Sequence, residues 1–482
     1  MQFLILSGKM NFFDIVFKVL AFSIFATFVS IAIYSVFLFF YVKISKFPKV
    51  KTSKKGYLKL AAIFIIVSIP FVYEIYHGMH SMYALYNITN LFLFIFIVVA
   101  SLRCISLIIF ATLQRYKKKE ILQIIPFVSI IIPVHNEENN IEKALNSVFK
   151  TDYRKKEVIV VDDGSTDKTL EILNRYSRKK PIRIISLKRS GKAKSLNAGI
   201  RKATGEIVIC ADADVIMSKS AISNLIKYFS DPKIGAVAAH VEIANKEGFV
   251  RRSGNLEYDL YFLTELAQSF LKMTTVTGAM TAFRKKALIE VGLFDPRMIA
   301  EDRDITYKLL KAGYQTIYCC DAKVYINVLN DMKDLVKQRY RWDRGIFRAM
   351  LKHMKAMSLN KFKYFLGLIN KLFFGLNDAL LYLYFEYFVS IWVIIFTLVS
   401  LDFMIFLEWF IFSTIIYAIL IIYAELLKKK IETRNALIAF TYRLFFKTVT
   451  DFIRTLSQIE EVATILTTSK NHHRKESNFT YW

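Results

Sequence analysis

Short apolar segments alternate with helix-type segments in the middle of this sequence, and that alternation restricts the possible fold more than any other feature. The apolar segments are rich in β-branched residues, and we expect strands at residues 128–133, 158–161, 182–187 and 207–210. The segments between them have helical spacing, at residues 141–149, 168–176 and 193–203. Such alternation is typical of a mostly parallel sheet covered by helices. The centre of the chain is therefore predicted to be an α/β domain.

The alternation fades after Pro232. Further strands are expected at residues 237–241 and 277–283, and helices at residues 254–271, 303–312 and 334–350. The sheet is thus predicted to be mixed but mostly parallel. The chain has four cysteines without metal-ligand spacing, and the adjacent Cys319 and Cys320 are expected at a strand end as packing thiols.

Two acidic clusters directly follow predicted strands. Asp162-Asp163-Gly164 ends the second strand, and Asp212-Ala213-Asp214 ends the fourth. A single acidic residue at such a place more often solvates a loop or caps a helix. Ligands of these sheets bind at the carboxyl ends of strands, so both clusters should converge on one crevice. Divalent cations bind few carboxylates and bridge substrate phosphates, which suits Asp212 and Asp214 as metal ligands.

A third acidic cluster, Glu301-Asp302 with Asp304 just behind, precedes a predicted helix. Its structural interpretation is helix capping, because carboxylates are favoured at a helix N-terminus. Its functional interpretation is a general base that deprotonates an acceptor hydroxyl. Nearby acidic groups would raise the pKa of such a base toward a useful value. Thr166-Asp167 is expected simply to cap the helix at residues 168–176.

A basic and aromatic cluster, Gln338-Arg339-Tyr340-Arg341-Trp342, follows the acidic ones. Its structural interpretation is a helix at a membrane surface. Its functional interpretation is a diphosphate clamp, because arginine forks bind phosphate oxygens and Trp342 offers a flat surface to a sugar ring. Gly191-Lys192-Ala193-Lys194 would add a basic loop. No P-loop or dinucleotide fingerprint occurs, which disfavours an NTPase or a dehydrogenase.

Long apolar runs flank this central region. Hydrophobic residues make up 54% of the chain, against about 45–50% in soluble domains. A helix needs about 20 apolar residues to cross a bilayer, and we expect spans at residues 18–41, 57–76, 91–113, 381–401 and 404–423. Residues 361–374 and 436–456 are amphipathic and favour interfacial helices, with a sixth span at 436–456 as the alternative.

The chain has a net charge of +27, and its basic runs lie beside the apolar spans, at residues 43–55, 115–119 and 428–430. This pattern marks cytoplasmic juxtamembrane loops and makes a nucleic-acid partner the weaker interpretation. The N-terminus is then outside and residue 115 onward inside. The sequence therefore predicts an integral protein of the plasma membrane, in contact with the lipid bilayer, with a cytoplasmic α/β domain.

Four regions follow from these patterns. Residues 1–120 are predicted to be an N-terminal transmembrane region of about three helices. Residues 121–355 form the α/β domain. Residues 356–468 hold interfacial and transmembrane helices, and residues 469–482 form a polar, basic tail.

Seven ordered stretches resemble one enzyme family. They are Ile131-Ile-Pro-Val-His-Asn-Glu-Glu138, Val160-Val-Asp-Asp-Gly-Ser-Thr-Asp167, Gly191-Lys-Ala-Lys-Ser-Leu-Asn197, Asp212-Ala-Asp214, Val276-Thr-Gly-Ala279, Met298-Ile-Ala-Glu-Asp302 and Gln338-Arg-Tyr-Arg-Trp342. The sequence is similar here to family 2 inverting glycosyltransferases with a GT-A fold. It resembles especially the processive membrane branch of poly-N-acetylglucosamine, chitin-oligosaccharide, hyaluronan and cellulose synthases. Ala300 departs from the family, which usually has Thr there.

The resemblance implies a role for each matching residue. Asp302 would be the catalytic base, and Asp212 and Asp214 would hold Mg²⁺ or Mn²⁺. The acceptor would contact Gly278, Glu301 and Trp342. The nucleotide sugar would contact Pro133, Asn136, Glu137, Asp163, Lys192, Asp212, Gln338, Arg341 and Trp342.

Three functions remain open at this stage. The first is an inverting, processive synthase that transfers sugar from a UDP-sugar to a β-linked polysaccharide, with N-acetylglucosamine as the first guess, and moves it across the membrane. The second is a non-processive transferase with a lipid acceptor, such as polyprenyl phosphate or a glycerolipid. The third is a catalytically dead scaffold, which the intact acidic set disfavours. Accessory membrane or cell-wall proteins are compatible with the first. The motifs do not identify the sugar, the product length or the oligomeric state.

Overall fold

The computed structural model describes residues 88–117, 125–245, 247–329, 331–357 and 403–429, together with short pieces between residues 438 and 461. The chain divides into two compact units. The smaller comprises Met1–Leu107 with Ala379–Leu420, and the larger comprises Ile108–Asp378 with Ile421–Trp482. The spans predicted at 18–41, 57–76 and 381–401, the amphipathic segment 361–374 and the tail 469–482 lie outside the described residues.

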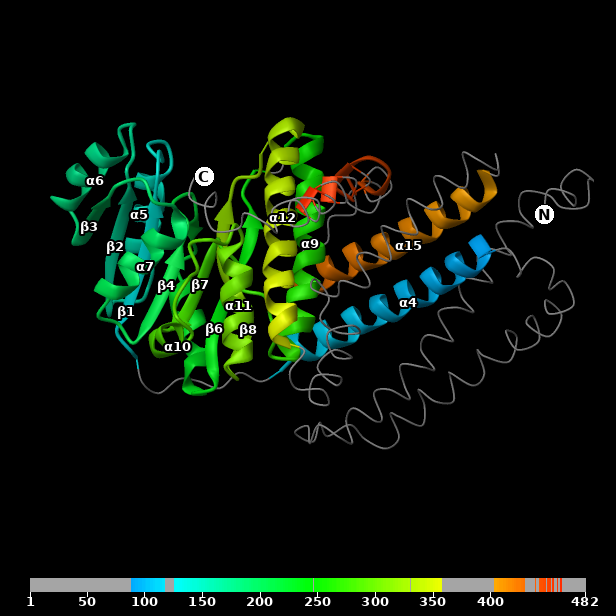
Figure 1. Ribbon diagram of the computed structural model, residues 1–482, viewed down its shortest axis with the longest axis horizontal. Helices are drawn as coiled ribbons and strands as arrows, with labels where there is room; N and C mark the ends of the chain where they lie inside the picture. Colours follow the sequence, from blue (N-terminus) through cyan, green and yellow to red (C-terminus); the bar gives the residue numbers. More distant parts are fainter. Residues whose placement is uncertain are drawn as a thin grey trace, which may run out of the picture. The chain divides into compact units, whose positions relative to one another are not determined.

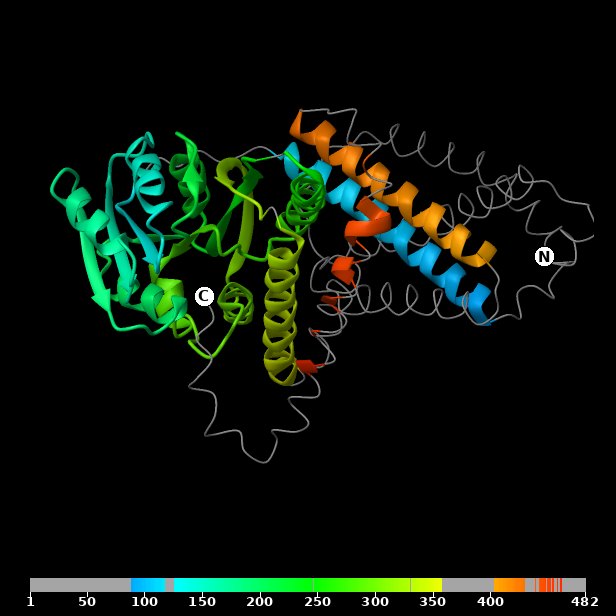
Figure 2. The ribbon, with the colours of Figure 1, turned by 90° about the horizontal axis from the view of Figure 1, so that it is seen from above.

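Two long apolar helices cover two of the predicted spans. Helix α4 (Ile88–Arg115) includes the span predicted at 91–113, and α15 (Phe403–Lys428) includes the span predicted at 404–423. The blue and orange helices run side by side in both ribbon views (Figures 1 and 2). Within the described part of the chain, one stretch, Trp409–Lys428, is long and apolar enough to cross a membrane.

The larger unit contains an eight-stranded mixed sheet with strand order β3-β2-β1-β4-β7-β6-β8-β5. Its strands are β1 (Val128–Val134), β2 (Lys156–Asp163), β3 (Ile182–Leu187), β4 (Ile207–Ala211), β5 (Ile216–Met217), β6 (Ile234–Ile243), β7 (Met280–Arg284) and β8 (Gln315–Ile326). Strands β1 to β4 pair in parallel, as do β6 and β8. The β4–β7, β6–β7 and β5–β8 pairs are antiparallel. The predicted mixed, mostly parallel sheet is therefore confirmed.

Helices cover both faces of the sheet, as Figure 1 shows. They are α5 (Ile141–Phe149), α6 (Thr169–Ser177), α7 (Lys192–Lys202), α8 (Ala221–Ile226), the 3₁₀ turn η2 (Lys227–Ser230), α9 (Phe249–Phe270), α10 (Lys285–Glu290), α11 (Glu301–Lys311) and α12 (Met332–Met357). Figure 2 shows α9 and α12 beside the sheet rather than above its centre. This arrangement matches the predicted alternation of strands and helices.

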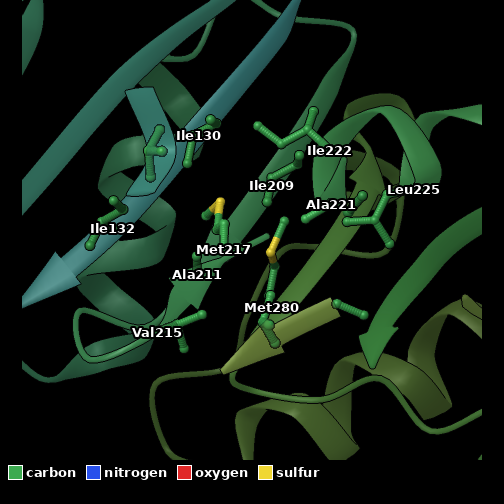
Figure 3. Close-up of a cluster of buried hydrophobic side chains, with 14 of the residues drawn as sticks. Ile130, Ile132, Ile209, Ala211, Val215, Met217, Ala221, Ile222, Leu225 and Met280 are labelled. Carbon is green, nitrogen blue, oxygen red and sulfur yellow. The ribbon is translucent and has the colours of Figure 1, made fainter. Parts of the chain in front are cut away.

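Successive residues of the inner strands point to opposite faces. Ile130 and Ile132 of β1 belong to a core with α5, α6 and α8, whereas Ile131 belongs to a second core with α7, α10 and α11. Figure 3 shows the first core, where β1 and β4 side chains meet Ile222 and Leu225 of α8. A strand buried on both faces needs a continuous apolar run, which explains the β-branched segments of the sequence.

Several elements differ from the expectation. Strand β7 begins at Met280 rather than at residue 277. Cys319 and Cys320 were expected at a strand end but lie inside β8, which the sequence patterns did not predict as a strand. Strand β8 alternates apolar residues with Lys, Asp and Thr, so it lacks the uniform apolar run of β1 or β4. Both thiols are buried packing groups, as expected.

The segment near the C-terminus that was expected to be interfacial makes ionic contacts with α12. Its described part includes the π-helical turn η3 (Tyr442–Lys447). Arg454 Nε donates to Asp343 Oδ1 at 2.6 Å. Farther on, Glu461 accepts hydrogen bonds from Arg344 at 2.6 Å and Arg348 at 2.7 Å. These contacts attach Arg454 and Glu461 to α12.

Candidate active site

A pocket at the carboxyl ends of the parallel strands brings four separate segments together. Strand β4 ends at Ala211, so Asp212 stands at its carboxyl end. Strand β7 runs antiparallel to β4, so the residues just before β7 come to this same edge. The amide of Asp212 accordingly donates to the carbonyl of Ala279 at 2.9 Å. The polar lining consists of Lys192, Asp212, Thr277, Gly278, Glu301 and Asp302.

Lys192 lies between carboxylates from two different elements. Its Nζ atom is 2.6 Å from Asp212 Oδ1 and 3.1 Å from Glu301 Oε1. Lys192 is the first residue of α7, and Glu301 is the first residue of α11. The first turn of α7 contains no acidic residue, so the carboxylates that pair with Lys192 come from other elements. Asp302 also lines the pocket, so three carboxylates and one ammonium group lie around it. The pocket therefore holds an excess of negative charge around one cation.

Gly278 occupies the centre of this group. A Cβ atom at Gly278 would lie 3.3 Å from Lys192 Nζ, 3.7 Å from Asp302 Oδ2 and 3.9 Å from Asp212 Oδ2. A side chain here would take up the space between the ammonium and the two carboxylates. Because glycine has no side chain, that space is open to a ligand. Gly278 was predicted as a site residue that contacts the acceptor, and that contact stays a prediction.

The electrostatics of the pocket raise the pKa of Asp212, of Asp302 and of Lys192. Burial raises the pKa of Asp212 to about 7, with Asp214 adding to the rise and Lys192 opposing it. Burial and the neighbouring Glu301 raise the pKa of Asp302 above its usual value. Burial would lower the pKa of Lys192, but Asp212 and Glu301 raise it well above the usual range. A carboxyl group with a raised pKa is a better proton acceptor once ionised.

Thr306 links Asp302 to the glycine loop. Its hydroxyl donates to the carbonyl of Asp302 at 2.7 Å and accepts from the amide of Val276 at 3.1 Å. The backbone that carries Asp302 is thereby tied to the backbone that leads into Gly278. Nothing in the spacing of the sequence indicated this role for Thr306, because the two segments meet only in the fold.

Asn197 links Lys192 to the loop before α11. Its side-chain amide donates to the carbonyl of Phe294 at 2.8 Å, and its carbonyl accepts from the amide of Phe294 at 3.0 Å. Both groups are buried, and such paired bonds fix the distance between two backbones. Asn197 is the last residue of the stretch Gly191–Asn197, which resembles the glycosyltransferase family. Its place in that stretch was the only feature of the sequence that indicated a role for it.

Asp163 lies outside the pocket lining and organises the loop before α7. Its carboxylate is fully buried and accepts from Arg189 at 3.1 Å, from Ser190 at 2.7 and 2.8 Å, and from the amide of Gly191 at 2.8 Å. These bonds hold the loop that delivers Lys192. The contact between Asp163 and a nucleotide stays a prediction.

The loop after β1 is hydrogen-bonded to the loop after β2. Asn136 accepts from the amide of Thr166 at 2.8 Å, and the amide of Glu137 donates to the Thr169 hydroxyl at 2.7 Å. The Asp167 carboxylate accepts from the amides of Thr169 and Glu138 at 3.0 and 3.2 Å. The expected cap is therefore found only in part, because α6 begins at Thr169 with Lys168 at the N-cap and without a side-chain hydrogen bond from that residue.

Glu137 is close enough to Asp214, one of the two metal-binding candidates, for that carboxylate to affect its pKa. Burial raises the pKa of Glu137, with Asp214 and Asp167 adding to the rise and Asn140 opposing it. Pro133 is buried and lies opposite Val161 of β2. The pairing of β1 with β4 has already ended at Ile131, so a residue without an amide hydrogen is tolerated at position 133.

The residues of α12 predicted to contact the donor are partly exposed on that helix and do not line the pocket. They are Gln338, Arg341 and Trp342. The arginine between them, Arg339, was not predicted as a site residue, yet it is almost fully buried. It pairs with Glu257 of α9, and its guanidinium lies 4.4 Å from the centre of the Trp342 ring. Arg339 therefore holds the face of Trp342 in place.

The two carboxylates predicted to bind metal differ in exposure. Asp214 is exposed, whereas Asp212 is partly buried and paired with Lys192. Among the described residues, no group of three or more His, Cys, Asp or Glu side chains is arranged to hold a metal ion. Two carboxylates suit a magnesium-type ion whose other ligands are water and phosphate oxygens. The donor set fits a cation that binds together with a diphosphate.

The fold and the pocket together define a class of protein. The structure is similar to that of a mannosyltransferase from Pyrobaculum calidifontis, described as a complex with GDP-Man and Mn²⁺. The two structures superpose with a TM-score of 0.51 at 18% sequence identity, and the superposition covers 77% of this chain and 99% of the mannosyltransferase chain. At that identity the similarity concerns the fold alone. The α/β domain therefore has a GT-A-like fold.

The sequence comparisons assign the domain more closely. Residues 129–292 match the family Glycosyl transferase family 2. The chain is 33% identical over 229 residues to the poly-beta-1,6-N-acetyl-D-glucosamine synthases of Staphylococcus aureus strain MSSA476 and of Staphylococcus epidermidis. This alignment covers 47% of this chain and 56% of each relative, so the chain spans about half the length of the curated relatives it matches. The chain contains a family 2 glycosyltransferase domain.

Proposed function

We propose that the protein is an inverting membrane glycosyltransferase that transfers sugar from a UDP-sugar to a growing β-linked polysaccharide and moves the product across the membrane. The similarity to the staphylococcal synthases supports N-acetylglucosamine as the sugar. The single observation that carries the proposal is the convergence of Lys192, Asp212, Glu301 and Asp302 around Gly278. The apolar helices α4 and α15 support the membrane location.

The reaction we propose is one in-line displacement at the anomeric carbon. Asp302 accepts the proton of the acceptor hydroxyl while the acceptor oxygen bonds to that carbon. The bond between the anomeric carbon and the phosphate oxygen breaks, and the electron pair leaves with UDP. The configuration inverts, so an α-linked donor gives a β-linked product.

The other residues orient the substrates and stabilise charge. Lys192 offers an ammonium group to the phosphate oxygens, and Gly278 leaves room for the reacting sugar. Asp212 and Asp214 would hold a bound Mg²⁺ or Mn²⁺, which would offset the negative charge of the departing diphosphate. Trp342, held by Arg339, would stack against a sugar ring of the acceptor, and Gln338 and Arg341 would contact the diphosphate.

Radiolabel incorporation tests the proposal. The full chain in lipid vesicles would receive UDP-N-acetylglucosamine, UDP-glucose or UDP-glucuronate with Mg²⁺ or Mn²⁺. We expect high-molecular-weight product from one donor, its loss in Asp302→Asn, and its retention in the control Asp334→Asn, whose carboxylate is exposed on α12. Label confined to organic-soluble lipid would overturn the polymerase and leave a lipid-directed transferase.

A further inference from the structure

Helix α12 touches the backbone that leads into α11. A Cβ atom at Gly345 would lie 2.9 Å from the amide nitrogen of Ala300 and 3.2 Å from Ile299 Cβ. Ala300 is the residue immediately before Glu301, the first residue of α11. The absence of a side chain at Gly345 thus allows α12 to approach the start of α11 closely.

Farther along the same face of α12, two basic residues reach Asp304. Asp304 is fully buried and lies two residues after Asp302. Its Oδ1 atom accepts from Lys352 Nζ at 2.6 Å and from His353 Nε2 at 2.9 Å. Lys308, one turn later on α11, lies 3.3 Å from the other carboxylate oxygen. Asp304 is therefore a direct bridge between the first turn of α11 and α12.

Lys352 extends this bridge to the loop before α11. Its Nζ atom also donates to Asp295 Oδ2 at 2.8 Å. Arg297 binds both oxygens of Asp295, at 3.0 and 2.9 Å, and so closes that loop on itself. One ammonium group on α12 thus holds the loop and the helix on either side of Glu301 and Asp302.

The charges of this cluster are arranged to keep both carboxylates ionised. Burial would raise the pKa of Asp304, but hydrogen bonds from His353 and Lys352 bring it below its usual value. Burial would also raise the pKa of Asp295, but hydrogen bonds from Arg297 and Lys352 hold that pKa well below its usual range. Removing one partner from a buried charge cluster is strongly unfavourable, so these contacts are rigid.

None of these cluster residues lines the pocket, so their effect on the reaction is indirect. We propose that Asp304 is a positioning residue that, through Lys352 and His353, fixes the first turn of α11 against α12 and so sets the place of the Asp302 carboxylate. The inference rests on the proposed function for the role of Asp302. It deepens that function by coupling Asp302 to the helix that carries Trp342.

Substitution of Asp304 tests the bridge. In Asp304→Asn we expect kcat to fall by about 10–100-fold, because a misplacement of about 1 Å has effects of this size. The KM for the UDP-sugar and the Kd for UDP should change by less than about threefold, since Asp304 does not contact the donor site. Amide hydrogen exchange over residues 301–306 should become faster, because the first turn of α11 loses its link to α12.

A pair of substitutions at His353 and one control variant separate positioning from general stability. A glutamine at 353 keeps a side-chain N–H donor, so His353→Gln should retain kcat whereas His353→Ala should lose it. Lys337→Met is the matched control, because it breaks the exposed Lys337–Asp334 pair on the same helix and should change neither kcat nor exchange. If Asp304→Asn fails to fold, Lys352→Met and His353→Ala report on the same bridge.

Unchanged exchange over residues 301–306 in Asp304→Asn would overturn the proposal. So would a loss of donor affinity that matches the loss of kcat, because that would indicate general damage to the domain. If the unsubstituted chain transfers no sugar from any UDP-sugar, the proposed function fails instead. The exchange measurement then still decides whether Asp304 joins α11 to α12.

Discussion

Two neighbouring parts of the strand-end edge have opposite electrostatic character. The first comprises the loops after β1 and β2 with the loop before α7, here called the paired loops (residues 134–140, 163–169 and 188–191). There Asp163 is surrounded by four hydrogen-bond donors. The second is the pocket, where Lys192 pairs with Asp212 and Glu301, and a third carboxylate, Asp302, lines the same space. The paired loops are satisfied without a ligand, whereas the pocket has charge that a ligand is needed to balance.

This difference indicates how the two parts contribute. A satisfied hydrogen-bond network stabilises the fold and holds residues in place. A group of like charges destabilises the fold and is retained where function requires it. We therefore expect substitutions in the paired loops to affect stability first, and substitutions in the pocket to affect turnover first.

The largest expected effect is on the pocket base. Asp302→Asn removes the proton acceptor, so kcat should fall by about 10²–10⁴-fold. The affinity for UDP should stay within about threefold, because the base acts on the acceptor. Initial rates and UDP titrations on the same preparation measure both. A fall in UDP affinity that accounts for the whole rate loss would contradict the assignment.

Gly278→Ala should come next. The new methyl group would lie 3.3 Å from Lys192 Nζ and 3.7 Å from Asp302 Oδ2. We expect kcat/KM to fall by about 10–100-fold, since the reacting groups are displaced by a fraction of an ångström. Gly254→Ala is a suitable control, because its Cβ atom would meet a Val328 methyl group away from the pocket. Equal losses in both variants would show that packing, and not the site, is responsible.

A pair of neutralising substitutions compares the two parts directly. Asp163→Asn should destabilise the domain by about 1–3 kcal/mol, because buried donors lose their charged acceptor. Glu301→Gln should instead raise Tm by about 2–4 °C, because it relieves repulsion between neighbouring carboxylates. Thermal unfolding of the two variants and the unsubstituted chain tests the signs. A loss of stability in both would break the comparison.

The smallest expected effect concerns pH. Burial raises the pKa of Asp167 slightly, but hydrogen bonds from Thr169 and from the amide of Glu138 bring it below its usual value of 3.8. Because the folded pKa lies below the unfolded one, Asp167 stabilises the fold above the unfolded pKa of about 3.9. That contribution is lost as the pH falls through the folded pKa.

Asp167→Asn should therefore flatten the decline of Tm between about pH 5 and about pH 3. The size of the change should be small, since the side chain is partly exposed to solvent. Unfolding curves across this range provide the measurement. Identical slopes for the variant and the unsubstituted chain would show that Asp167 does not contribute.

The sequence and its family resemblance assigned to the site five residues that the structure brings together in the pocket. They are Lys192, Asp212, Gly278, Glu301 and Asp302, whereas the other assigned residues do not line it. Asp212 lies there because the end of a parallel strand fixes the edge at which its following residue lies. Their roles in binding and catalysis remain predictions that the proposed experiments test.

The sequence was insufficient for residues that act through another residue. Arg339 was taken as one member of a basic cluster, yet it is buried between Glu257 and the ring of Trp342. The sequence also did not show that the Asp163 carboxylate accepts hydrogen bonds from the loop before α7, whereas its contact with a nucleotide stays a prediction. Such pairings join residues tens of positions apart, and a pattern along the chain carries no information on which of them meet.

The sequence by itself determined the α/β class, the order of the motifs and the apolar character of the flanking segments, because hydrophobic periodicity acts locally along the chain. Three features became known only from the tertiary structure. They are the antiparallel pairing of β7 with β4, the strand at Gln315–Ile326, and the hydrogen bonds from Lys352 and His353 to Asp304. Each of these depends on contacts between distant segments, whose energies arise only when the core has formed.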